Sequence, residues 1–100
     1  MVNSVLDKKG AELISDFMLH PGEALLDEVE ARGLKKSDLA KELGILPSHL
    51  SELFRGKRNV TAITAVKLER ALGISAEYWL GLQTDYDLAN ARRELVVIAS

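Results

Sequence analysis

Residues 47–58 combine side chains that are suited to binding a polyanion. Hydroxyl, imidazole and carboxylate groups precede a run of basic residues. Hydroxyl and imidazole groups can hydrogen bond to base edges in a DNA groove, a carboxylate can accept from a cytosine amino group, and Arg and Lys bind phosphates. We therefore expect a DNA-contacting surface, whose candidate residues are Lys36, Pro47, Ser48, His49, Ser51, Glu52, Arg55, Lys57 and Arg58.

Each group in this set has an expected role and an alternative. Ser48 and Glu52 are expected to contact bases, because the first residues of such a helix usually meet base edges. Alternatively, Glu52 orients Arg55 one turn away, or the polar face only meets solvent. The Arg and Lys side chains that follow are expected to bind phosphates, as is Lys36.

The charge distribution supports this location. The chain has a net charge of −2, yet residues 35–58 hold six basic and three acidic side chains. The remaining residues hold seven basic and twelve acidic side chains. The positive charge is therefore concentrated on the candidate surface, as phosphate contact requires.

The composition argues against several other kinds of site. The chain has no cysteine, and His20 and His49 are not spaced for a zinc site. We find no acid–base pair, nucleophile constellation or phosphate loop, so we expect neither a cofactor nor an enzyme. No apolar run approaches the ~20 residues that span a membrane, and acidic residues interrupt the stretch after Lys8 and Lys9. These features predict a cytoplasmic protein.

The elements that must position the candidate surface are two short helices. Ala40, Gly44 and Leu50 have the spacing of a helix-turn-helix. The small Ala40 permits close helix contact, Gly44 permits positive φ in the turn, and Leu50 anchors the second helix. The sequence predicts these helices at 36–43 and 47–55.

Three further helices are expected, over 21–32, 62–72 and from 76 to 92 or beyond. Pro21 suits a first helical position, and Thr61 and Ser75 suit N-caps. The predicted fold class is therefore all-α with five helices. The positions expected to face the core are Leu25, Leu26, Val29, Leu39, Ala40, Leu43, Ile45, Leu50, Leu53, Ile63, Val66, Leu68 or Ala71, and Leu72.

Around the domain at 20–93, we expect an N-terminal arm at 1–19 and a short C-terminal tail at 94–100. Leu13, Ile14, Phe17 and Met18 could form one apolar helix face in the arm. The β-branched stretch Leu95–Ala99 is the one place where a strand is an alternative.

The predicted last helix has apolar and aromatic residues at helical spacing. Trp79 is expected in the core, and its neighbours are expected to contribute to core and dimer contacts rather than to a ligand pocket. A two-fold dimer would place two recognition helices about 34 Å apart and would require a palindromic operator. The candidate dimer residues are Tyr78, Leu82, Tyr86, Leu88, Ala89 and Arg92.

Several motifs together resemble those of a known family. The resemblance covers about residues 20–92 and is to the HigA (VapI-like) antitoxins, a branch of the lambda-repressor-like XRE helix-turn-helix proteins. The motifs that carry it are His20-Pro21-Gly22-Glu23, Asp38-Leu39-Ala40, Leu43-Gly44, Gly56-Lys57-Arg58, Ala71-Leu72-Gly73 and the segment from Tyr78-Trp79-Leu80 through Gln83, Tyr86 and Asp87 to Arg92.

The resemblance implies a lambda-repressor-like fold and a homodimer that binds a palindromic double-stranded DNA operator in its own promoter. It also implies a HigB-type toxin partner that cleaves messenger RNA and that the antitoxin neutralises. Pro47 and Glu52 stand where the family often has Arg, so the recognition face is less basic. The alternatives are a stand-alone XRE regulator and a protein-interaction module whose DNA binding has decayed. For the arm, three roles stay open: packing on its own domain, swapping across a dimer, and binding the toxin.

Overall fold

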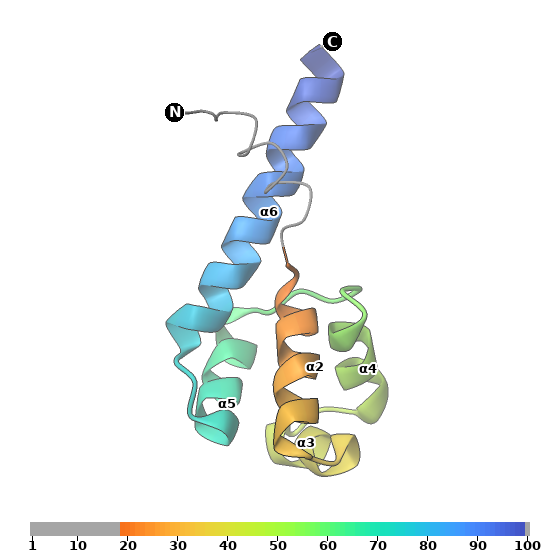
Figure 1. The fold of residues 1–100 in the computed structure, drawn as a ribbon, viewed down its shortest axis with the longest axis vertical. Coiled ribbons are helices and arrows are strands. Elements are labelled where there is room, and N and C mark those ends of the chain that lie inside the picture. Colours follow the sequence, from red (N-terminus) through yellow and green to blue (C-terminus); the bar gives the residue numbers. More distant parts are fainter. Residues whose placement is uncertain (1–18, 100) are drawn as a thin grey trace.

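The computed structural model describes residues 19–99, which form five helices and no strand (Figure 1). This confirms the predicted all-α class and, within one or two residues, the predicted starts of all five helices. The helices are α2 (Pro21–Arg32), α3 (Lys36–Leu43), α4 (Pro47–Phe54), α5 (Ala62–Leu72) and α6 (Ala76–Ala99).

Side-chain caps explain where three of the helices begin. His20 Nδ1 accepts a hydrogen bond from the Gly22 N–H at 2.9 Å, ahead of α2. Thr61 Oγ1 accepts from Thr64 N–H at the start of α5, and Ser75 Oγ accepts from Tyr78 N–H at the start of α6. These bonds satisfy amide groups that have no partner within the helix.

The helix-turn-helix adopts the expected geometry. Ala40 is buried at the contact between α3 and α4, and Leu50 is buried on α4. Gly44 ends α3 with φ of 69°, a left-handed conformation that glycine adopts with little strain. Ala40, Gly44 and Leu50, from which the helix-turn-helix was predicted, therefore have the roles that were expected of them.

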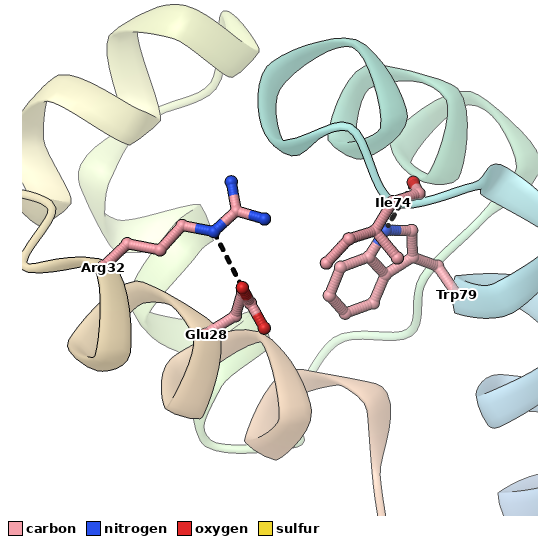
Figure 2. A network of polar contacts seen from close by, with 4 residues as sticks. All are labelled: Glu28, Arg32, Ile74 and Trp79. Atoms are coloured by element: carbon pink, nitrogen blue, oxygen red, sulfur yellow. Dashed lines mark hydrogen bonds and ion pairs between the residues drawn. The ribbon is translucent and has the colours of Figure 1, made fainter.

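The core lies where all five helices meet, and Trp79 is its largest fully buried side chain, with 1% exposure. Its indole N–H donates to the Ile74 carbonyl at 3.2 Å, so the buried polar atom is satisfied (Figure 2). Figure 2 also shows Arg32 paired with Glu28 on α2, an exposed pair of little energetic weight. Burial of Trp79 fixes the start of α6 against the domain.

The rotation of α5 differs from the prediction. Ile63 is 70% exposed and Val66 is also exposed, whereas Ala65, Leu68 and Leu72 face the core. The expectation that Ile63 and Val66 are buried was wrong. Both faces of α5 carry apolar residues, so side-chain type alone did not specify which face packs.

The C-terminal stretch is helical. The helix α6 continues through residues 94–99 and projects beyond the other helices (Figure 1), so the strand alternative for Leu95–Ala99 was wrong. A strand needs a neighbouring strand to satisfy its backbone, whereas a helix satisfies its own. The apolar face predicted for residues 13–18 of the arm lies outside the described residues. None of the helices within 19–99 is long and apolar enough to cross a membrane.

Candidate nucleic-acid interface

The start of α4 presents an exposed polar edge. Pro47, Ser48 and Ser51 are exposed, and His49 and Glu52 are partly buried. Leu46 immediately precedes them and is 70% exposed, although no role was predicted for it. Since apolar side chains contact thymine methyl groups in the major groove, Leu46 adds a candidate base contact to this edge.

Glu52 forms an ion pair that links α4 to the following loop. Its Oε1 accepts from Arg58 Nη2 at 2.7 Å and from Arg58 Nε at 3.0 Å. The hydrogen bond and the charge of Arg58 lower the pKa of Glu52 below its ordinary value. The alternative prediction was that Glu52 orients Arg55. The arginine that bonds to the Glu52 carboxylate is Arg58, so this alternative named the wrong arginine.

His49 lies beside this pair as a neutral group. Burial, followed by the positive charges of Arg58 and Lys67, lowers its pKa below 6.5, against an opposing effect of Glu52. A neutral imidazole has one donor and one acceptor nitrogen. At neutral pH, His49 can therefore pair with a base edge or a phosphate through a directed hydrogen bond but adds no positive charge.

A loop of fixed geometry, which we call the basic loop (residues 55–58), follows α4. Its glycine, Gly56, has φ of 73°, and the Lys57 N–H donates to the Glu52 carbonyl at 2.9 Å, which closes the end of the helix. The three basic side chains of the loop are exposed. The local backbone therefore leaves these side chains accessible to a phosphate, which is the contact predicted for them.

Lys36 joins the basic loop from another element. Its Nζ lies 5.5 Å from the centre of the Phe54 ring, a cation–π contact. Phe54 is the last residue of α4 and directly precedes Arg55. The packing of α3 on α4 thus brings Lys36 to the same end of α4 as the basic loop.

The His20-Pro21-Gly22 segment, at the start of α2, packs against α4. A side chain on Gly22 would place its Cβ 1.6 Å from the Leu53 carbonyl oxygen, so only glycine allows α2 to approach α4 this closely. His20 is 1% exposed and contacts the Tyr86 ring edge-on, with 4.8 Å between ring centres. His20 therefore caps α2 and packs against Tyr86 of α6, while the role of Gly22 was not predicted.

Gln83 is a second residue whose role the sequence did not reveal. It is 5% exposed on α6, and its Oε1 accepts from the Val60 N–H at 2.7 Å. Its Nε2 donates to Asn59 Oδ1 at 3.2 Å and to Asp87 Oδ1 at 3.0 Å. These bonds tie α6 to the chain directly after the basic loop. The signal in the sequence was a lone amide within an apolar helix stretch.

The predicted dimer residues on α6 differ in accessibility. Tyr78, Leu88 and Arg92 are exposed, and Leu82 and Tyr86 are partly buried. Ala89 is buried within the single chain. The exposed members remain candidates for a partner surface, whereas Ala89 has little surface to contribute.

Comparison with known proteins agrees with this arrangement. The model of the helix-turn-helix family HTH_3 matches residues 25–79. Virulence-associated protein I of Dichelobacter nodosus is 43% identical over 77 residues, which cover 76% of this chain and 71% of that protein.

Two solved structures share the fold. An addiction-module antidote protein of the HigA family from Coxiella burnetii is 35% identical, with a TM-score of 0.72 over 77% of this chain and 85% of that one. The Pseudomonas aeruginosa antitoxin HigA, solved with the higBA promoter, is 32% identical, with a TM-score of 0.73 over the same shares, 77% and 85%.

Proposed function

Because the chain belongs to the HTH_3 helix-turn-helix family and is similar to HigA antitoxins, we propose that it is a DNA-binding antitoxin. In this proposal a homodimer binds a palindromic operator in its own promoter and represses it. The same protein neutralises a HigB-type toxin that cleaves messenger RNA. The observation that carries the DNA-binding part is the exposed polar start of α4 together with the basic loop and Lys36 at the other end of the same helix.

In this proposal, the two ends of α4 have different tasks. The N-terminal end, with Leu46, Ser48 and the face that continues to Ser51, enters the major groove and contacts base edges. The C-terminal end, with the basic loop, contacts the phosphates that flank the groove. Phosphate contacts set the register of the helix, and base contacts discriminate sequence.

Glu52 occupies an unfavourable place for a carboxylate near phosphates. Its ion pair with Arg58 neutralises both charges in the free protein. On DNA, phosphates compete with Glu52 for the Arg58 guanidinium, or Glu52 accepts from a cytosine amino group. The net positive charge of the DNA-contacting surface is therefore smaller than the number of its basic residues suggests.

Titration of a fluorescent duplex that carries the promoter of its own gene, over a range of salt concentrations, tests this proposal. We expect tight binding at low salt and a linear fall of log K with log [salt]. Arg55→Ala should weaken binding and flatten the salt dependence by about 0.9 for each phosphate that the variant no longer binds. Arg93→Ala removes the same charge from the projecting part of α6 and serves as the control.

Two results would count against this proposal, the first against DNA binding itself and the second against a phosphate contact by Arg55. The first is a lack of binding to the promoter at low salt, whether or not the toxin is present. The second is an Arg55→Ala variant whose salt dependence equals that of the parent protein.

The toxin part of the proposal is tested separately. Co-expression with the product of the adjacent reading frame should rescue growth and yield a co-purifying complex. Promoter binding without any adjacent toxic product would instead indicate a stand-alone regulator.

A further inference from the structure

The basic loop is held at both ends, and its second attachment comes from a different helix. At its start, the Arg55 N–H donates to the Ser51 carbonyl of α4, and the Lys57 N–H donates to the Glu52 carbonyl. Directly after it, the Val60 N–H and the Asn59 side chain bond to Gln83 of α6. In Figure 1 the chain that follows α4 runs past the start of α2 toward α6. A backbone segment fixed at both ends loses little conformational freedom on binding, which favours affinity.

Gln83 uses all the hydrogen-bonding capacity that its amide N–H groups provide. Both are donated, one to Asn59 and one to Asp87, while the oxygen accepts from Val60. Because the side chain is buried, loss of these bonds would leave polar atoms without partners. The contact therefore has a defined geometry rather than one of several exchangeable arrangements.

Asp87 determines which way the amide of Gln83 points. Its carboxylate only accepts, so it must face the NH₂ group of Gln83. This orientation directs the amide oxygen of Gln83 to the Val60 N–H. Asp87 is itself exposed and lies one turn further along α6. Its hydrogen bond reaches the chain after the basic loop through Gln83.

We propose that Gln83 and Asp87 are positioning residues that hold the basic loop in the conformation that binds operator phosphates. This inference rests on the proposed DNA-binding function and goes further, because it makes α6 part of the operator-binding machinery. Neither residue is expected to touch DNA.

The test exchanges the amide group of Gln83 and the carboxylate group of Asp87. Gln83→Glu places a carboxylate opposite Asp87 and removes the donors. The double variant Gln83→Glu/Asp87→Asn restores a donor–acceptor pair with its direction reversed and keeps the net charge of the parent. Thr84→Glu adds the same charge as Gln83→Glu at the adjacent exposed position and is the matched control.

Binding of the promoter duplex is measured against salt, and exchange of the Val60 amide proton is measured by NMR. In Gln83→Glu we expect at least a tenfold loss of affinity, a shallower salt slope and faster Val60 exchange. The double variant should recover all three properties. Thr84→Glu should retain the parent slope. A purely structural role would lower the folded fraction without changing the salt slope of the folded protein.

Several outcomes would overturn the inference. One is a folded Gln83→Glu variant with the parent salt slope, and another is a double variant that behaves like the single one. If Gln83→Glu does not fold, Asp87→Ala removes the orienting acceptor at an exposed site. An unchanged slope and unchanged Val60 exchange in that variant would equally refute it. Absence of promoter binding by the parent would overturn the proposed function and this inference together, whereas the first three results would leave the proposed function standing.

Discussion

At the scale of single residues, the structure shows that some of the candidate DNA-contacting residues bond to one another. Glu52 and Arg58 show this most directly, because each was predicted to contact DNA, and in the free protein they bond to each other across six positions. Both remain partly accessible, so the pair is a surface feature that a phosphate can open.

Glu52→Gln tests whether this pair restrains DNA binding. We expect higher operator affinity, because the substitution removes a negative charge from the interface and frees Arg58. Stability toward urea should change little, since exposed ion pairs contribute weakly. Affinity is measured with the promoter duplex. A marked loss of affinity would instead indicate that Glu52 contacts a base.

His20 makes a pH-dependent contribution to stability. Burial lowers its pKa, against opposing effects from Asn59, Glu23 and Asp87. The neutral imidazole is the form whose Nδ1 accepts from Gly22, and protonation removes that acceptor. Because the folded pKa lies below the unfolded value of 6.5, this contribution is present above pH 6.5 and decreases as the pH falls below it.

Urea unfolding at pH 7.5 and pH 5.5 measures this effect. The parent protein should lose stability at the lower pH. His20→Asn retains a capping side chain that does not titrate, so it should lose less. His49 titrates in both proteins, so its contribution to the loss of stability cancels when the two proteins are compared. An equal loss in both would assign the pH dependence to groups other than His20.

At the scale of elements, the approach of α2 to α4 decides where the recognition helix sits. Gly22→Ala should destabilise the protein by about 1–3 kcal/mol, because the new methyl group overlaps the Leu53 carbonyl and α4 must shift. Thermal and urea unfolding measure the change. We also expect weaker promoter binding, since α4 carries the candidate contacts.

Gly81 provides the matched control within the same chain. It lies in α6, it is exposed, and a Cβ there meets nothing within 4 Å. Gly81→Ala should stabilise the protein by about 0.5–1 kcal/mol through helix propensity. Similar effects of the two substitutions would show that the contact between α2 and α4 is not tight.

At the scale of the whole molecule, the proposed homodimer requires an apolar face that contacts a second copy. Several exposed apolar side chains are available among residues 19–99, and they include Leu88 on α6 and Ile63 with Val66 on α5. The predicted interface includes Leu88, so Leu88→Glu should convert a dimer into a monomer that retains its helical content. Sedimentation and circular dichroism measure these properties.

Ile63→Glu is the comparison variant for that experiment. It introduces the same charge at another exposed apolar site, which lies on α5. If dimers persist in Leu88→Glu and are lost in Ile63→Glu, the two-fold contact lies on α5, and the predicted α6 interface is wrong. Loss of promoter binding in whichever variant is monomeric would further link dimerisation to the operator.

The sequence by itself determined the helices and the approximate location of the candidate interface. Pro21, Gly44 and Thr61 mark helix ends through φ preferences and local hydrogen bonds, which involve only nearby residues. The basic loop was likewise visible as a local cluster of charge. Such features follow from short stretches of chain and need no knowledge of packing.

Only the tertiary structure decided which residues meet across elements. It selected the face of α5 that packs, matched Glu52 with Arg58, and showed why Gly22 must be glycine. It also joined Gln83 to Val60, 23 positions away. Such contacts depend on how helices rotate and approach, which is set by the packing of the whole core rather than by the order of side chains along any one helix.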